Sequence, residues 1–389
     1  MAVAFLAIAF VAPMYELRPN RIAAGTSLPL WSSPLALGTC LLTLVLLSAS
    51  LYTRRRELGK VPGRVSRPIL RALWWVSIVT AVVAIVGSAA YRPPSGDVFT
   101  SSVAWRVSPS LGFWSIVCGS ALLSRWTAGL VRPTGIVKAA RAVGTVALVV
   151  VAWRLGLLDR FSPYAEFRAQ GGRFWNELGR HVFLSGAAFG FALFVGIAGA
   201  VLLSRGRKIG RILGFIAGVV QNIPSLALFG LLLPVMAALA NAVPALRVIG
   251  VSGIGVAPAF VALSAYALLP IMLAGAAGLR MVEQGAKDAA RGMGMSGRQI
   301  LFRVELPLAL PAIAGGARTA LVQTIGTTTV AALIGAGGMG YFVFQGVGQA
   351  AMDMVIVGVA PVVAMSLAAD RLMSSLELHL AGEGAGQWH

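Results

Sequence analysis

The chain has 389 residues, of which 58% are hydrophobic and only 12% are charged. Soluble domains carry about 25% charged residues, so this composition excludes an ordinary soluble protein and is typical of a membrane protein. The net charge of +19 does not predict nucleic-acid binding, because the basic residues lie in short loops between apolar runs rather than in one patch.

Residues that commonly build metal or catalytic sites are few. Cys40 and Cys118 lie in or beside apolar stretches, with neither disulfide nor metal-ligand spacing. The histidines, His181, His379 and His389, form no cluster. We therefore expect no metal, no cofactor and no catalytic residue.

Five membrane spans are expected in the first half, at 1–14, 28–52, 72–91, 111–124 and 142–158. The loop 54–71 is rich in Arg and Lys and contains one acid, Glu57, so the positive-inside rule places it in the cytoplasm. Alternation then places the basic loop 125–141 inside and 92–110 outside. The opening residues lack the basic region and cleavage site of a signal peptide, so we expect the first span to be retained.

Residues 159–180 interrupt the apolar pattern with acids, a proline and two glycines. Their aromatic residues predict a helix lying at the membrane interface. We place a boundary here, with an accessory transmembrane bundle over 1–160 and an interfacial linker over 161–180.

The second half predicts spans near 181–204, 211–240, 254–280, 308–334 and 351–372. Its uncharged runs, such as 212–246, exceed the roughly 20 residues that one span requires, so each must also hold a kink, a re-entrant piece or a connection. The basic loops 205–211 and 281–306 are expected inside. The sequence thus predicts an all-α protein of about ten transmembrane helices in a lipid bilayer, with both termini, including a tail over 378–389, in the cytoplasm.

One polar loop, 283–307, is too charged and too rich in small residues to be core. Helical periodicity over Asp288, Ala289, Ala290 and neighbouring residues predicts a short helix that Gly294 ends with a positive φ. Ser296 and Gln299 fit a capping box for a second helix. Val304 and Leu306 follow, and Pro307 suits the first turn of the next span. This arrangement predicts a small rigid knob beneath the membrane that docks onto a second protein.

The chain resembles the permease subunits of ATP-binding-cassette (ABC) importers of the glycine betaine, choline and proline (osmoprotectant) class over residues 181–377. The stretches 288–294 and 304–307 resemble the general importer signature, with Asp288 replacing its usual Glu. The stretches 221–228 and 334–340 resemble this substrate class in particular. The resemblance implies a C-terminal five-helix type I permease core, preceded by extra spans over 1–160.

The resemblance also implies partners and a mechanism. A separate ABC ATPase dimer would grip the loop 283–307 of two permease copies, identical or not. A periplasmic substrate-binding protein would deliver the solute at the bacterial inner membrane. ATP binding would then switch the helices from facing inward to facing outward. The chain itself has no Gly-x-x-x-x-Gly-Lys-Ser/Thr phosphate loop, so it is not the ATPase.

Gly335, Gly337 and Gly340 match a dinucleotide-binding spacing, but they lie in an apolar span, and the next acid, Asp353, comes too early. A backbone bend at the outer mouth of the pathway is the better interpretation.

Pro224 predicts a kink, beside which Asn222 and Ser225 either satisfy the freed carbonyls or face the solute. Thr327 and its neighbours form a second polar stripe that either joins helices or faces the solute.

Arg318 is an intramembrane charge, with Asp353 and Asp370 as candidate partners. A quaternary ammonium is usually bound by aromatic side chains. In the core these are Tyr341, which we assign to the substrate pathway, and three further rings, those of Tyr266, Phe342 and Phe344.

Two alternatives stay open. One is a permease of the same architecture for another solute, such as methionine or an alkyl sulfonate. The other is a secondary transporter, which inverted repeats and paired intramembrane acids would favour. We find neither feature in the sequence.

Overall fold

The computed structural model describes residues 2–18, 25–56, 66–87, 106–248 and 250–382. The chain divides into two compact units. The N-terminal unit comprises residues 1–169 with 349–353, and the core unit comprises 170–348 with 354–389.

The N-terminal unit is mainly helical, with a small sheet. Its helices are, in order, α1 (Ala2–Val11), α2 (Pro34–Arg56), α3 (Ser66–Gly87), α4 (Leu111–Val131), α5 (Gly135–Arg154) and α6 (Ser162–Ala169). Its strands are β1 (Tyr15–Arg18), β2 (Thr26–Leu28) and β3 (Arg106–Pro109).

The sheet is antiparallel in the order β2-β1-β3, with Glu16 opposite both Ser27 and Ser108. The sequence did not predict it, because strands of three or four residues are too short to show a period-two pattern, and the β1 and β3 pairing joins distant segments. Residues 161–180, for which the sequence predicts a helix within an interfacial linker, are largely helical. They comprise α6 and the first part of the long helix α7.

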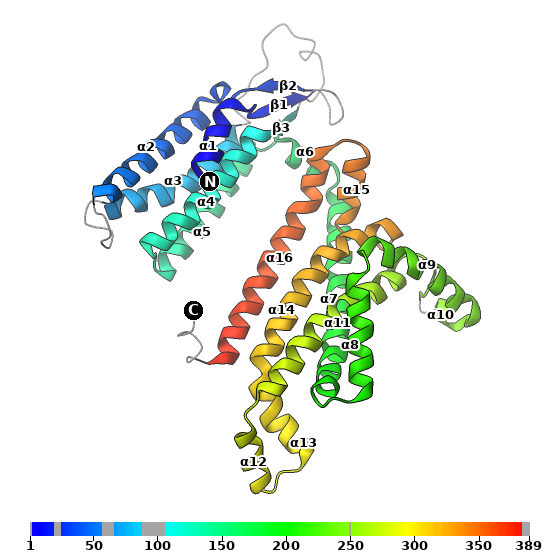
Figure 1. The fold of residues 1–389 in the computed structure, drawn as a ribbon. Helices are drawn as coiled ribbons and strands as arrows, with labels where there is room; N and C mark the ends of the chain where they lie inside the picture. The colour runs from blue at the N-terminus through cyan, green and yellow to red at the C-terminus, as the bar shows by residue number, and fades with distance from the viewer. Residues whose placement is uncertain (1, 19–24, 57–65, 88–105, 249, 383–389) are drawn as a thin grey trace. The chain divides into compact units, whose positions relative to one another are not determined.

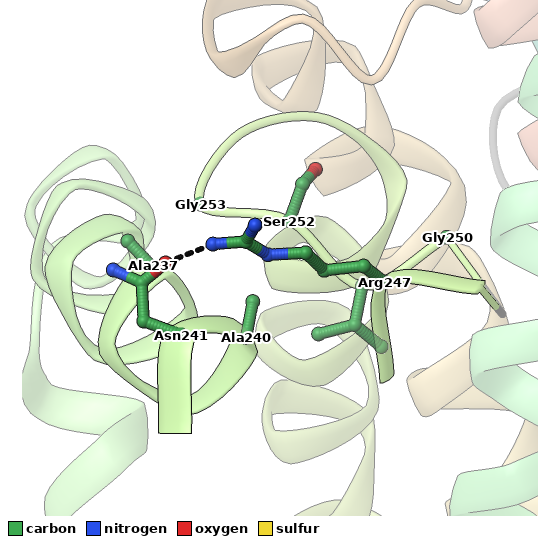
Figure 2. A pocket seen from close by; sticks show the side chains of 8 residues that line it. Ala237, Ala240, Asn241, Arg247, Gly250, Ser252 and Gly253 are labelled. Atoms are coloured by element: carbon green, nitrogen blue, oxygen red, sulfur yellow. Dashed lines mark hydrogen bonds between the residues drawn. The ribbon is translucent and has the colours of Figure 1, made fainter. Parts of the chain in front are cut away.

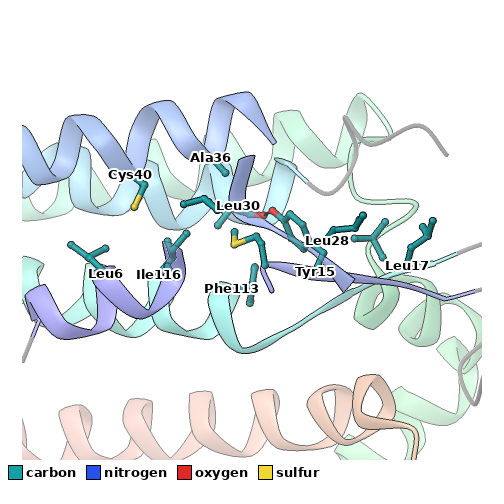
Figure 3. Close-up of a cluster of buried hydrophobic side chains, with 13 residues drawn as sticks. Leu6, Tyr15, Leu17, Leu28, Leu30, Ala36, Cys40, Phe113 and Ile116 are labelled. Atoms are coloured by element: carbon teal, nitrogen blue, oxygen red, sulfur yellow. Dashed lines mark hydrogen bonds between the residues drawn. The ribbon is translucent and has the colours of Figure 1, made fainter. Parts of the chain in front are cut away.

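The buried centre of this unit lies where the sheet meets α1, α2 and α4 (Figure 3). Leu6, Leu30 and Ile116 are fully buried there, and Tyr15 is 1% exposed. The Tyr15 hydroxyl donates a hydrogen bond to the carbonyl of Ala84. Burial raises the pKa of Tyr15 above its ordinary value, so the phenol stays protonated and keeps this bond.

The core unit is helical in the part of it that the structure describes (Figure 1). Its elements are α7 (Gly171–Ser204), α8 (Lys208–Asn222), α9 (Ser225–Ala242), α10 (Ala245–Val248), α11 (Val256–Met281), α12 (Gln284–Gly292), α13 (Gly297–Ile300), α14 (Leu306–Ala331), α15 (Gly340–Gly348) and α16 (Met352–Ala381). The run expected to hold a span over 211–240 and a kink at Pro224 breaks at Ile223 and Pro224 into the two helices α8 and α9.

Helix α11 lies at the centre of the core unit, between α7 and α14. Small residues bring these helices close together, as is usual for packing in lipid. A Cβ on Gly275 would lie 2.8 Å from Ala200 of α7, and a Cβ on Gly316 of α14 would lie 2.8 Å from the Pro270 carbonyl of α11. The three helices are therefore closely packed along these small residues.

The polytopic helical architecture is confirmed. Seven helices among the described residues are long and apolar enough to cross a membrane, and 36–52 forms a shorter apolar helix. The expectation of about ten spans also counted the N-terminal residues and 111–124. Helix α1 has only 10 residues, which at 1.5 Å per residue is about half of a 30 Å hydrocarbon layer.

Candidate functional site

The loop 283–307, which we call the coupling loop, projects beyond the ends of α11 and α14 (Figure 1). Helix α12 ends in two capping hydrogen bonds. The amide of Met295 donates to the carbonyl of Ala290 at 3.1 Å, and that of Gly294 to the carbonyl of Arg291 at 2.9 Å. Gly294 has φ of +78°. These are the features of a Schellman termination, which requires a left-handed residue at the position of Gly294.

The second helix of the loop begins with the expected capping box. Ser296 accepts a hydrogen bond from the Gln299 amide at 3.4 Å, and the Gln299 side chain accepts one from the Ser296 amide at 2.8 Å. Pro307 lies in the first turn of α14. It does not begin a new helix, however, because a π-helical turn over Leu301–Glu305 joins α13 to α14. The second half of the loop is therefore a continuous extension of a membrane helix.

The outer surface of the coupling loop is mainly polar, with the exposed apolar side chains of Met293 and Phe302 on it. Asp288 is 59% exposed and pairs with Arg291 at 2.5 Å. Ala289 is exposed, Ala290 is 1% exposed, and Met293 is 70% exposed. The ion pair between Asp288 and Arg291 is exposed to solvent, so it contributes little to the stability of the fold. Asp288, Ala289 and Met293 thus form a surface available to a partner, while Ala290 holds α12 against the rest of the loop.

The base of the loop is tied to the membrane helices in two ways. Leu301 and Leu306 pack against the buried cluster that contains Ala200 of α7 and Leu279 of α11. The carboxylate of Glu305 also forms ion pairs with Arg205, which follows α7, at 3.2 Å and with Lys287 of α12 at 3.9 Å. Val304 is half-buried and Pro307 is exposed. The base of the loop is therefore packed against α7, α11 and α14 together.

The break between α8 and α9 is braced against a second irregularity, in α11. Pro270 has no amide hydrogen, so it leaves the Tyr266 carbonyl without its helical donor. The Gln221 side chain donates to that carbonyl at 2.5 Å. In return, the Tyr266 hydroxyl donates to the Ile223 carbonyl at the break. The two interruptions satisfy each other's backbone groups.

Asn222, Pro224 and Ser225 all lie at this break. Asn222 is exposed and donates to the Gly218 carbonyl at 2.8 Å, within its own helix. Pro224 is the N-cap residue of α9, and Ser225 is its first residue. Asn222 therefore does not satisfy the Ile223 carbonyl at the break, nor the Val220 carbonyl that Pro224 leaves without its donor, which accepts from the Ile223 amide at 3.1 Å. Tyr266, 5% exposed with its hydroxyl engaged, is not available to an aromatic cage.

The other pathway candidates lie on α14 and α15. Thr328 is fully buried and donates to the Thr324 carbonyl at 2.7 Å, whereas Thr327 is half-buried. Tyr341 is half-buried, and the guanidinium of Arg173 lies 3.8 Å from its ring centroid. Phe342 is fully buried, so it is also unavailable as an open ring. No hydrogen bond among the described residues joins Asn222, Thr327 and Tyr341 into one site.

The glycine-rich segment between α14 and α15 is a bend, as expected. Gly335, Gly337 and Gly338 all have positive φ. The Gly338 amide donates to the buried carboxylate of Glu177 at 2.7 Å. The Met339 amide lies 3.3 Å from His181 Nδ1. This segment is therefore fixed to α7.

His181 holds a single tautomer in this arrangement. Its Nδ1 accepts from the Met339 amide, so Nε2 carries the proton and donates to the Ile325 carbonyl at 3.0 Å. Sequence reasoning missed Gln221, Glu177 and His181. The only available signal was that each is a polar residue beside or within an apolar run.

Arg318 pairs with Asp370 at 2.6 Å and with Glu377 at 3.6 Å. The expectation of Asp370 as its partner is confirmed, and that of Asp353 is wrong. The Asp353 carboxylate is 2% exposed and accepts hydrogen bonds from Ser108 at 2.8 Å and Ser162 at 2.6 Å within the N-terminal unit. Among the described residues no group of His, Cys, Asp or Glu could hold a metal.

The end of the core unit away from the coupling loop contains a pocket of about 460 Å³. Its lining comes from the end of α9, from α10 and from the segment leading into α11. Arg247 crosses it and donates a hydrogen bond to Asn241, with Ser252 nearby (Figure 2). Arg247 is the one charged residue between Arg211 and Arg280 in the sequence.

The family described as binding-protein-dependent transport system inner membrane component matches residues 191–381. The family described as the N-terminal domain of the ABC transporter permease YehY matches residues 1–163. A structure of the MetNI methionine ABC transporter, in an inward-facing conformation, is 24% identical with a TM-score of 0.43, covering 52% of this chain and 95% of that chain.

Three curated proteins are each similar to between 53% and 58% of the chain. The osmoprotectant import permease protein OsmW of Salmonella typhimurium is 35% identical over 205 residues, 53% of this chain and 90% of OsmW. The choline transport system permease protein OpuBD of Bacillus subtilis is 33% identical, covering 58% and 93%. The carnitine transport permease protein OpuCB of Listeria monocytogenes is 31% identical, covering 55% and 91%.

Proposed function

We propose that this chain, which belongs to the family of binding-protein-dependent inner membrane permeases of ABC importers, carries a compatible solute such as glycine betaine, choline or proline into the cell. As a member of this family it is a multi-pass transport subunit of the bacterial inner membrane rather than an enzyme, and it works with an ATPase and a binding protein. The proposed solute class rests on relatives that are osmoprotectant, choline and carnitine permeases.

The observation that carries this proposal is the construction of the coupling loop. Its outer face presents Asp288, Ala289 and Met293, while its base is packed and ion-paired to α7, α11 and α14. An ATPase bound to that face would turn three packed helices at once. We infer that two such loops, one on each of two permease copies, are drawn together when an ATPase dimer closes, and that both termini of the chain lie on the same cytoplasmic side.

The translocation route that we propose passes the irregular backbone of the core. Irregular backbone is tolerated within a membrane where it lines a cavity or is satisfied by neighbouring groups. The break at Pro224 leaves the exposed side chain of Asn222 and the hydroxyl of Ser225 beside it. Thr327 and the ring of Tyr341 would meet the solute further along the path. The guanidinium of Arg173 lies over the Tyr341 ring. A quaternary ammonium that bound this ring would therefore displace that guanidinium.

The binding protein would deliver the solute at the end of the core opposite the coupling loop. Helix α11 has 26 residues, which corresponds to about 39 Å at 1.5 Å per residue. It therefore separates the coupling loop from the Arg247 pocket by the thickness of a membrane. An acidic side chain of the binding protein would be a suitable partner for Arg247.

The test is uptake by the importer reconstituted with its ATPase and binding protein in liposomes. We expect ATP-dependent accumulation of radiolabelled glycine betaine or choline, and no accumulation of methionine. The variant Asp288→Ala should assemble and lose most of this uptake, whereas Asp288→Glu, which restores the usual residue of the motif, should retain it. Accumulation of methionine alone would overturn the solute class, and full uptake by Asp288→Ala would overturn the coupling role.

A further inference from the structure

Arg141 of α5 is a buried cation in the N-terminal unit, and the proposed transport function does not involve it. Its side chain is 7% exposed. Its Nη2 donates to Ser124 Oγ of α4 at 2.7 Å, and its guanidinium lies 4.1 Å from the ring centroid of Trp74 in α3. These contacts hold the group in place but supply no negative charge. A buried charge without a counter-ion is costly, so an anion is expected beside it.

The N-terminal unit does not provide that anion from its helices. None of α1 to α5 contains an acidic residue. The acids of this unit that the structure describes are engaged elsewhere. Their partners are Arg18 for Glu16, Arg106 for Glu166, Arg168 for Asp159, and two serines for Asp353. Two further acids of this unit, Glu57 and Asp97, lie outside the described residues. Glu57 directly follows α2 in the sequence, in the basic loop expected in the cytoplasm, and is the alternative counter-ion.

Arg141 and its two partners lie at similar distances from the ends of their helices. Arg141 is six residues from the start of α5, Ser124 seven from the end of α4, and Trp74 eight from the start of α3. At 1.5 Å per residue these offsets are about 9–12 Å. They are measured from the ends that the basic loops place in the cytoplasm. Tryptophan is enriched at this level of a bilayer, where lipid head groups begin.

The rim of this site is basic. Lys138 is exposed and lies one helical turn closer to the cytoplasmic end of α5 than Arg141. A guanidinium offers five N–H donors in a geometry that matches phosphate, and only one donor of Arg141 is used by a described hydrogen bond. Basic sites between membrane helices on the cytoplasmic side bind anionic lipid head groups.

We propose that Arg141, Ser124 and Lys138 bind the phosphate of an anionic phospholipid of the cytoplasmic leaflet, with Trp74 holding the guanidinium in position. The lipid would neutralise the buried charge and join α3, α4 and α5 at their cytoplasmic ends. This inference concerns the N-terminal unit and does not depend on the proposed solute.

The experiment measures lipid retention by the purified full-length chain in detergent, by native mass spectrometry, with phosphatidylglycerol and phosphatidylcholine as probes. We expect wild type to retain phosphatidylglycerol selectively. Arg141→Gln should bind it about tenfold more weakly, and Ser124→Ala a few-fold more weakly. The matched control Arg125→Gln removes an exposed charge from the neighbouring position of α4 and should bind as wild type does.

Three outcomes would overturn the proposal. Equal retention of phosphatidylglycerol by wild type and Arg141→Gln would exclude the site. Thermal protection by inorganic phosphate in place of the lipid would identify a free anion as the ligand. Loss of stability in Glu57→Gln, without selective lipid retention by wild type, would identify Glu57 as an internal counter-ion. If Arg141→Gln does not fold, equal retention by Ser124→Ala and wild type would count against the site.

Discussion

Replacing Gly294 tests the shape of the coupling loop without touching its charges. A Cβ at Gly294 meets nothing within 4 Å, so Gly294→Ala introduces no clash and acts only through the backbone. An alanine at φ of +78° pays about 1–2 kcal/mol for the left-handed conformation. At about 1.4 kcal/mol per factor of ten, the docking-competent loop becomes roughly 5–30-fold less populated relative to unwound forms.

The neighbouring Gly292 is a matched control. It also has open space around its Cβ position, but it is the last residue of α12 and has no positive φ. Gly292→Ala should therefore leave the loop intact or stabilise α12 by up to about 1 kcal/mol. Gly294→Asn, a residue that tolerates the left-handed region, should fall between wild type and Gly294→Ala.

The assay is ATP-driven uptake by the reconstituted importer, together with hydrogen exchange of the loop amides. We expect Gly294→Ala to lose most uptake and to show faster exchange at the capped amides of Gly294 and Met295, with the thermal unfolding midpoint of the purified chain little changed. Uptake by Gly294→Ala equal to that of Gly292→Ala would refute the reasoning, because the loop geometry would then be irrelevant to coupling.

Two further substitutions test the core. Tyr266→Phe removes the donor to the Ile223 carbonyl and should destabilise the purified chain by about 1–3 kcal/mol, measured by chemical unfolding in detergent micelles; an unchanged free energy of unfolding would show that the helix break needs no brace. Gly340→Ala would place a Cβ 1.8 Å from the Thr329 carbonyl oxygen, so we expect little folded protein by size-exclusion chromatography, whereas Gly348→Ala, which has open space, should fold normally. Normal yields of both glycine variants would contradict the packing described here.

The coupling loop could be predicted from sequence because its structure is local. A positive-φ glycine, a serine cap and a glutamine three residues later each act within one helical turn, and the structure has all three. The π-helical turn that makes α13 and α14 continuous was not predictable, since it depends on packing of Leu301 and Leu306 against other helices.

Long-range hydrogen bonds account for most of what the sequence did not predict. Gln221 donates to the carbonyl of Tyr266, 45 residues away in sequence, and Tyr266 donates to the carbonyl of Ile223, so no local pattern indicates either bond. Asp353 was a plausible partner for Arg318 by sequence, but it accepts bonds from serines that precede it by 245 and 191 residues. The roles of the pathway residues, and the domain boundaries at 160 and 180, stay predictions.

The most direct test of the account is a cross-link between the coupling loop and the ATPase. Met293 is 70% exposed at the end of α12. The experiment starts from a variant in which the two native cysteines, Cys40 and Cys118, are replaced by alanine. A cysteine introduced at Met293 should cross-link to the ATPase and react with an impermeant maleimide only from the cytoplasmic side. One introduced at Val248, 88% exposed near the opposite end of α11, should react only from the periplasm. Labelling of Met293→Cys from the periplasm, with no cross-link to the ATPase, would contradict the account.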